Sequence, residues 1–245
     1  MTDYIYGKNS IEETIRNSPH RINKILISEN NKFDKKINYM INFCKENKIK
    51  FQFVLKEKID KTVPNTAHQG VVAFISPIKY TSLDEFLVSL KKTNALVVML
   101  DSIEDVHNLG AIIRTSVCAG VDGIIIPDKR SVSVTSAVEK ISAGAVNKIP
   151  IIRVSNLCNS ILKLKKNGFW VVGAEADCDK YYFDIDYNMN CVIVLGEENQ
   201  GISNIVRKNC DYMVKIPIIG EFNSLNVSNA ASVVIYEAVR QRLLK

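Results

Sequence analysis

Short apolar runs alternate with polar stretches of helical spacing along most of the chain. In the first third, runs at residues 24–28, 50–55 and 70–76 are rich in Val, Ile and Phe, which is typical of β-strands. Between the first two runs, apolar positions from about residue 33 to 46 recur at helical spacing. Pro77 then interrupts the pattern. Residues 1–76 are therefore predicted to form a compact α/β unit.

Two positions carry a Ser followed three residues later by a Glu, the signature of a helix N-terminal capping box. Ser10 with Glu13 predicts a short helix near the N-terminus. Ser82 with Glu85 predicts one helical turn inside a linker at residues 77–93.

From residue 94 onward, β-branched runs alternate with helical stretches. A helix is predicted at residues 155–167, closed by Gly168, and another from about residue 226 to 243. Near-continuous apolar strands separated by helices indicate a mainly parallel sheet covered on both faces. Residues 94–245 are therefore predicted to be a second α/β domain, with strands at residues 95–100, 123–127, 148–152, 169–174, 191–196 and 212–217.

The positive charge of the chain is concentrated in its first third. The net charge is +6, and residues 1–80 hold 14 Lys+Arg against 8 Asp+Glu, whereas residues 81–245 hold 18 of each. Such a basic unit attracts a nucleic-acid backbone regardless of sequence. A lysine-rich face that only keeps the protein soluble explains the count equally well.

Several classes of function are disfavoured. No apolar run is long enough to cross a bilayer and no secretion signal is visible, so a cytoplasmic location without membrane contact is expected. Six cysteines form no CxxC pair and three histidines are scattered, so reduced thiols and no metal site are expected. The phosphate-binding, dinucleotide-binding and hydrolase motifs GxxxxGK[ST], GxGxxG, GxSxG and HExxH are absent.

Three segments place polar residues directly after predicted strands, at the sheet edge where open α/β folds bind ligands. The first, residues 101–120, carries Asn108 and Arg114. Helix capping by Asn108 and a solvated Arg114 would explain this segment without any ligand.

The other two segments are residues 194–203 and 215–237. Gly196 permits close approach of a ligand to the backbone, and Glu198 follows at the same edge. Ser224 and Asn226 open the last predicted helix, whose free N–H groups suit an adenosine or carboxylate group. An ordinary strand-turn-helix connection, in which acids favour the helix N-terminus, would explain the first of these segments without a ligand, and Ser224 alone is most simply a helix N-cap.

Taken together, the segments resemble the SpoU/TrmH family of RNA 2′-O-ribose methyltransferases in the SPOUT superfamily. HNLGAIIRTSVCAG, LGEENQG and IPIIGEFNSLNVSNAA are similar to the three family motifs in order, and ISAGAV to a further family segment. YGKNSIEETI and HQGVVAFISP resemble the two ends of the small ribosomal-protein-like substrate-binding domain of RlmB-type enzymes, which modify a guanosine of 23S rRNA.

The resemblance implies a parallel sheet with a C-terminal trefoil knot, preceded by the small RNA-binding domain. It also implies S-adenosylmethionine as cofactor, RNA as partner and a homodimer. By their matching positions, the catalytic residues would be Arg114, Asn108, Glu198, Ser224 and Asn226. The cofactor-binding residues would be Gly196, Ile216, Leu225, Leu195 and Ile218, and the RNA-binding residues Tyr6, Lys8, Asn9, His68 and Arg114.

The family pattern gives Arg114 a part in activating the ribose hydroxyl. A guanidinium is a poor base, so we expect it chiefly to clamp the adjacent phosphate and stabilise the emerging alkoxide. Glu197, Asn199 and Asn229 depart from the pattern, which we expect to alter loop geometry and not the reaction. A tRNA methyltransferase, a resistance-type rRNA methyltransferase and a non-catalytic ribosome-assembly protein remain alternatives.

Overall fold

The computed structural model describes residues 3–63, 68–198 and 200–244, and its contacts divide the chain into two compact units. The first unit comprises Met1–Lys79 and Val134–Lys148, and the second comprises Tyr80–Ser133 and Ile149–Lys245. The hydrophobic pattern placed residues 134–148 with the rest of residues 94–245, whereas their contacts are with the first unit.

The first unit contains a four-stranded mixed sheet in the order β1-β4-β2-β3. Its strands are β1 (Asp3–Tyr6), β2 (Ile22–Ser28), β3 (Lys50–Val54) and β4 (Val71–Ile75). β2 is parallel to β3 and antiparallel to β4, which is also antiparallel to β1. The three predicted strands are present, and β1 was missed because its four residues are too short to show a period. Pairing of Tyr6 with Val72 brings the two ends of this unit together.

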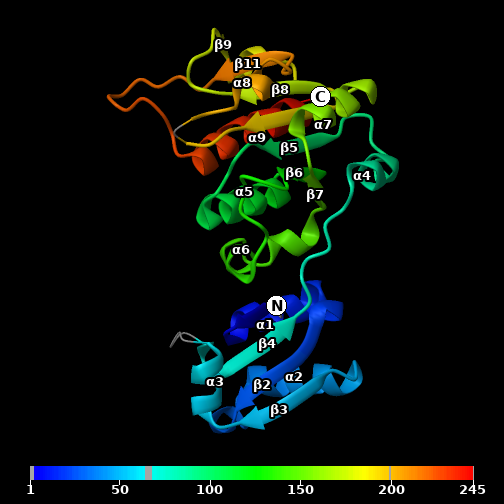
Figure 1. Ribbon diagram of the computed structural model, residues 1–245, viewed down its shortest axis with the longest axis vertical. Coiled ribbons are helices and arrows are strands. Elements are labelled where there is room, and N and C mark those ends of the chain that lie inside the picture. Colours follow the sequence, from blue (N-terminus) through cyan, green and yellow to red (C-terminus); the bar gives the residue numbers. More distant parts are fainter. Residues whose placement is uncertain (1–2, 64–67, 199, 245) are drawn as a thin grey trace. The chain divides into compact units, whose positions relative to one another are not determined.

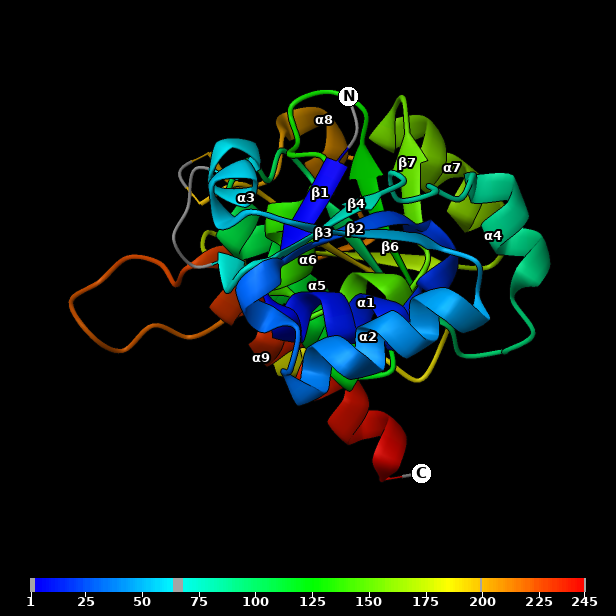
Figure 2. The ribbon, with the colours of Figure 1, turned by 90° about the horizontal axis from the view of Figure 1, so that it is seen from below.

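Helices cover both faces of this sheet. Ile25 and Ile27 belong to the apolar cluster under α1 (Lys8–Asn17) and α2 (Lys35–Glu46), which lie side by side (Figure 2). The intervening Leu26 packs with α3 (Lys56–Thr62) on the other face. This alternation follows from the two-residue period of a strand. The short α6 (Ser136–Ile141) also belongs to this unit.

The two predicted capping boxes have different outcomes. The box at Ser82 is confirmed, because its Oγ accepts from the Glu85 N–H and its own N–H donates to the Glu85 carboxylate. The box at Ser10 is wrong. α1 begins one turn earlier, after Gly7 at φ 88°, so Ser10 lies inside the helix.

The second unit contains a seven-stranded, wholly parallel sheet in the order β7-β6-β5-β10-β8-β11-β9 (Figure 1). The mainly parallel sheet is therefore confirmed. Of the strands in the described part of this unit, only the two-residue β9 was not predicted, and β7 begins three residues later than predicted. The strands are β5 (Leu96–Leu100), β6 (Gly123–Pro127), β7 (Ile151–Val154), β8 (Trp170–Ala174), β9 (Lys180–Tyr181), β10 (Cys191–Leu195) and β11 (Tyr212–Lys215).

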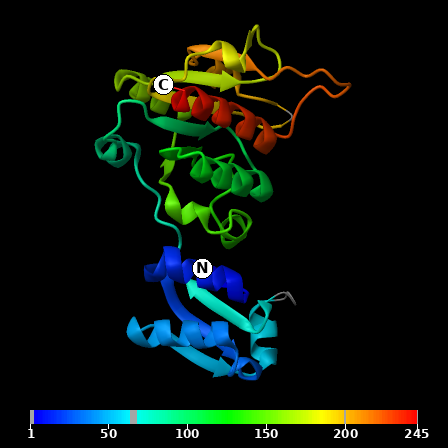
Figure 3. The ribbon, with the colours of Figure 1, turned by 180° about the vertical axis from the view of Figure 1, so that it is seen from behind.

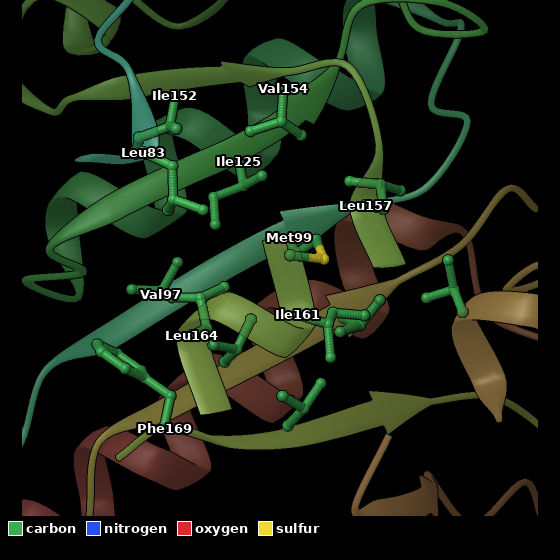
Figure 4. Packing of buried hydrophobic residues seen from close by; sticks show 14 of the residues in the cluster. Leu83, Val97, Met99, Ile125, Ile152, Val154, Leu157, Ile161, Leu164 and Phe169 are labelled. Carbon is green, nitrogen blue, oxygen red and sulfur yellow. The ribbon is translucent and has the colours of Figure 1, made fainter. Parts of the chain in front are cut away.

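Two helical layers cover this sheet. One face packs on α4 (Leu83–Ser89), α7 (Leu157–Lys166) and α8 (Asn204–Arg207), and Figure 4 shows the buried cluster between them and the strands. α5 (Val106–Cys118) and α9 (Val227–Leu243) lie side by side over the other face (Figure 3). Among the described residues, no helix is both long and apolar enough to cross a bilayer.

Candidate active site

A pocket of about 480 Å³ lies where the carboxyl ends of β8, β10 and β11 meet the start of α9. Parallel strands bring these ends to one edge of the sheet although they are far apart in sequence. All five residues predicted to bind the cofactor line this pocket: Leu195, Gly196, Ile216, Ile218 and Leu225. Glu198 and Ser224, predicted as catalytic, line it as well.

The loop between β10 and α8, here called the pocket loop, forms one wall of the pocket and is tightly folded. A Cβ on Gly196 would lie 2.1 Å from the backbone of Gly201, and Glu197 pairs with Gly201 across the loop. Gly196 is therefore required for the close packing of the loop on itself, whereas the sequence suggested close approach of a ligand. Asn199, which departs from the family motif, lies outside the described residues.

The pocket is acidic. Glu175, Asp177, Glu197 and Glu198 line it together with a single described cation, Arg207. Arg207 is already engaged, because its Nη1 lies 3.0 Å from Glu175 Oε2 and its Nη2 donates to the Asp177 carbonyl at 2.9 Å. The excess of carboxylates favours a positively charged ligand.

Sequence reasoning missed Glu175, Asp177 and Arg207. Glu175 follows β8 directly, so the rule that placed Glu198 at the sheet edge could also have identified it. Its Oε1 accepts from the Ile202 N–H at 3.3 Å, which joins the end of β8 to the loop after β10.

Asn226 is the centre of a polar cluster beside the pocket. It caps α9, with its Oδ1 accepting from the Ser228 N–H and hydroxyl at 2.9 and 2.6 Å. Its Nδ2 donates to Asn108 Oδ1 at 2.9 Å and lies 3.5 Å from Glu198 Oε2. Neither Asn108 nor Ser224 is a helix cap, because Asp105 caps α5 and Asn226 caps α9. Three of the predicted catalytic side chains thus meet.

The buried carboxylate of Asp101 holds the end of the pocket loop that leads into α8. Asp101 follows β5, and its Oδ2 accepts from the Ser203 N–H and hydroxyl at 2.8 and 2.6 Å. Ser203 is the residue from which α8 begins. Asp101 therefore fixes the pocket loop where it meets α8. Its position in the sequence did not reveal this role.

Arg114 does not join this cluster. It is exposed, it is the ninth residue of α5, and it is not among the described residues that line the pocket. Six residues at about 100° each turn it about 120° away from Asn108 around the helix axis. Arg114 therefore points away from Asn108 and from the polar cluster around Asn226.

The residues predicted to bind RNA in the first unit have mixed surroundings. Lys8 Nζ lies 2.8 Å from Asp34 Oδ2, a hydrogen bond that holds the pKa of the Asp34 carboxyl below its usual range. Asn9 accepts from the Lys36 ammonium, and the ring of Tyr6 lies under the ammonium of Lys140.

His68, the remaining candidate, is buried with both ring nitrogens engaged. Its Nδ1 accepts from the Gly70 N–H at 2.9 Å, so the proton is assigned to Nε2, which lies 2.7 Å from Asp60 Oδ1. This side chain therefore holds its own loop and offers no free ring nitrogen to RNA.

The described residues contain no group of three His, Cys, Asp or Glu side chains suited to a metal ion. Burial raises the pKa of the Cys44 thiol to about 11 and those of Cys191 and Cys210 to about 12. These three thiols are thus protonated at neutral pH and unsuited to nucleophilic chemistry.

Comparison with known proteins agrees with this geometry. Residues 95–236 match the SpoU rRNA Methylase family, and residues 4–81 match the RNA 2′-O ribose methyltransferase substrate-binding family. Candidate TrmH family tRNA/rRNA methyltransferases of Staphylococcus haemolyticus and Staphylococcus aureus strain COL are each 46% identical over 240 residues, covering 97% of this chain and 95% and 96% of theirs.

Solved structures give the same fold. The SpoU methyltransferase AviRb from Streptomyces viridochromogenes, in complex with AdoMet, superposes with a TM-score of 0.84 at 24% identity, covering 98% of this chain and 90% of that one. An AdoMet-bound rRNA methyltransferase from Sinorhizobium meliloti gives 0.82 at 24% identity, covering 100% and 88%. Because residues 95–236 match the family model and the staphylococcal relatives are 46% identical over 97% of the chain, the chain belongs to the SpoU methyltransferase family.

Proposed function

We propose that this protein methylates a ribose 2′-hydroxyl of RNA with S-adenosylmethionine as methyl donor, and that the substrate nucleotide is a guanosine of 23S rRNA. The observation that carries the proposal is the pocket at the ends of β8, β10 and β11, bordered by the cluster of Asn108, Glu198 and Asn226. The match of residues 4–81 to a substrate-binding family supports the choice of RNA. By the same family resemblance, we propose a trefoil knot in the second unit and a cytoplasmic location.

The pocket fits the methyl donor in size, polarity and charge. Its volume lies within the range of sites for small organic molecules, and apolar side chains of Leu195, Ile216 and Leu225 suit an adenine ring. The carboxylates around it favour a sulfonium cation. When bound, S-adenosylmethionine supplies a methyl carbon whose bond to sulfur breaks as a ribose oxygen attacks, leaving a neutral thioether.

The polar cluster would orient the ribose at the mouth of the pocket. Asn226 presents its amide beside Glu198, and Ser224 lines the pocket two residues earlier. Because the sulfonium sulfur is a good leaving group, the protein must mainly align the reacting atoms and assist loss of the hydroxyl proton. The polar cluster would provide this alignment by orienting the ribose towards the methyl group.

Arg114 would reach the reaction from a second copy. The phosphate next to the target ribose needs a cation, and Arg207, which lines this acidic pocket, is already paired. Arg114 is exposed on α5, and Ile219 and Phe222 are 97% and 85% exposed on the loop that leads to α9. We therefore propose a homodimer that covers these apolar side chains and brings Arg114 of the partner subunit to the pocket.

Mass mapping of ribose methylation tests the proposed reaction. Purified protein is incubated separately with 23S rRNA and with tRNA, in each case with S-adenosylmethionine carrying a labelled methyl group, and the modified nucleotide is located in RNA fragments. A single labelled 2′-O-methylguanosine is expected. Label on tRNA instead would support the tRNA methyltransferase alternative. Absence of label on both RNAs, together with no heat of S-adenosylmethionine binding on calorimetry, would support the assembly-protein alternative.

Arg114→Lys tests the proposed part of the arginine. Lysine keeps the positive charge but cannot donate two parallel hydrogen bonds to one phosphate, as arginine can. Turnover at saturating RNA is expected to fall by at least about tenfold, which corresponds to about 1.4 kcal/mol of lost transition-state stabilisation. Near-normal turnover would rule out both the clamp and the activating role.

A further inference from the structure

Phe33 exposes 95% of its surface in the turn between β2 and α2 of the first unit. It directly precedes Asp34, the N-cap of α2. An apolar residue at this position commonly packs against the fourth residue of the helix. That residue is Asn38, which is polar and exposed. The ring of Phe33 therefore makes no contribution to the core of its unit.

The turn that carries Phe33 is held firmly in place. Asn31 Nδ2 donates to the Gln69 carbonyl at 2.7 Å, and the Lys8 N–H donates to Gln69 Oε1 at 3.1 Å. Asp34 accepts from the Lys8 ammonium with one carboxylate oxygen and caps α2 with the other. Three segments are thereby joined: the start of α1, the turn and the loop before β4. A ring on such a support is preorganised for binding.

Lysines and a second aromatic ring accompany Phe33. Lys32 and Lys35 are both exposed on either side of the Phe33–Asp34 pair. Tyr39, one helical turn after Lys35 on α2, is 43% exposed. Aromatic faces interleaved with ammonium groups bind single-stranded nucleic acid, because bases stack on the rings and phosphates pair with the cations.

We propose that Phe33 is a base-stacking residue of the RNA-binding surface. An unpaired base of the RNA stacks on its ring, and Lys32 and Lys35 contact the flanking phosphates. The excess of lysines over acids in this unit favours RNA over a second copy of the chain as the occupant. The inference rests on RNA being the substrate but is independent of the pocket.

Binding of RNA to the full-length protein tests this surface. Fluorescence anisotropy would compare a labelled single-stranded RNA of about 12 nucleotides with its fully paired duplex. Phe33→Ala is expected to raise the Kd for the single strand about tenfold and that for the duplex less than about twofold. Phe33→Trp should stay within about twofold of wild type, because it keeps an aromatic face.

Two controls separate stacking from apolar bulk. Phe33→Leu keeps bulk without an aromatic face and should bind as weakly as Phe33→Ala. Leu55→Ala removes another apolar side chain, 63% exposed in the same unit, and should leave the Kd unchanged. The melting temperature of each Phe33 variant should match wild type, because the ring is outside the core.

Unchanged single-strand affinity in Phe33→Ala and Phe33→Leu would overturn the inference, as would equal losses for single strand and duplex. A change in oligomeric state of Phe33→Ala, seen by sedimentation, would assign the ring to contact with a second copy instead. Wild-type protein that binds neither RNA would defeat the proposed function itself, which distinguishes the two failures.

Discussion

At the scale of single residues, the structure separates side chains that the sequence could only list together. Asn226 and Asn108 share a hydrogen bond, whereas Arg114 is exposed on another side of the same helix as Asn108. Both ring nitrogens of His68 form hydrogen bonds to residues nearby in the chain, Asp60 and Gly70. A family motif identifies which residue types are needed, but their directions depend on where each lies around its helix and on which elements pack together.

Substitution of Asn226 can separate helix capping from orientation of the ribose. Asn226→Asp keeps an oxygen that caps α9 but loses the amide donor to Asn108 and places a second carboxylate near Glu198. We expect unfolding free energy close to wild type and a large loss of kcat. Asn226→Ala should lose kcat and also about 1 kcal/mol of stability, because the cap is gone.

Denaturant unfolding and steady-state methylation at saturating RNA would measure both quantities. Wild-type kcat in Asn226→Asp would show that the amide group takes no part in the reaction.

At the scale of elements, the local hydrophobic pattern predicted the strands and the long helices, but it did not predict how they pack against one another. The parallel strands of the second unit were predicted because each is a short, continuous apolar run bounded by turns. The short α3 and α6 were missed, since six or seven residues give too few turns to show a period. The pocket loop also depends on a contact between elements, Glu175 against Gly201, that no local pattern encodes.

Gly201→Ala should disturb the pocket loop, whereas Gly168→Ala, a matched control, should not. Gly201 has φ 66°, and a Cβ there would lie 2.3 Å from Glu175 Oε1. Gly168 has a similar φ of 79°, but a Cβ there would meet nothing within 4 Å. Both alanine variants should lose about 1 kcal/mol from the backbone conformation.

Only Gly201→Ala should also weaken binding of S-adenosylmethionine, by about tenfold or more on calorimetry, because Glu175 must move. Equal cofactor affinity in the two variants would show that the contact between Gly201 and Glu175 does not shape the site.

A buried ion pair fixes α6 within the first unit. Arg21 Nη1 lies 3.1 Å from both carboxylate oxygens of Glu139, and Asn147 contacts both partners. Arg21→Met would leave the Glu139 carboxylate buried without its cation, which should cost about 3–5 kcal/mol of unfolding free energy.

The double variant Arg21→Met with Glu139→Leu should recover most of that loss, since neither charge then remains buried. Chemical denaturation of the full chain measures both. A double variant as unstable as the single one would mean that the packing around the pair, and not its charge, holds α6.

At the scale of the whole molecule, the two units differ in charge and in task. The basic first unit suits RNA, and the acidic pocket of the second suits a cationic cofactor. Deletion of residues 1–76 is expected to leave cofactor binding and to remove rRNA methylation. Because residues 134–148 belong with the first unit, such a deletion would also remove β1, which α6 contacts, and Arg21, which pairs with the buried Glu139, so point variants are the cleaner test.

A mixture of two inactive variants tests whether the active site is shared between subunits. Arg114→Ala supplies an intact pocket, and Asn226→Asp supplies an intact Arg114. If Arg114 acts across the dimer, an equal mixture refolded together should recover about a quarter of wild-type activity, because half of the dimers are mixed and each has one complete site. No recovery, although light scattering shows mixed dimers, would place Arg114 in its own subunit's site.

The sequence by itself determined the order of strands and helices, the basic first third and the three polar segments at strand ends. These are local properties, set by hydrophobic period and composition. Only the tertiary structure decided which polar side chains meet, since Asn108 and Asn226 are 118 residues apart and touch because α5 and α9 lie together. It also decided that residues 134–148 belong with the first unit, because burial of Glu139 depends on Arg21, whose position in space no local pattern specifies.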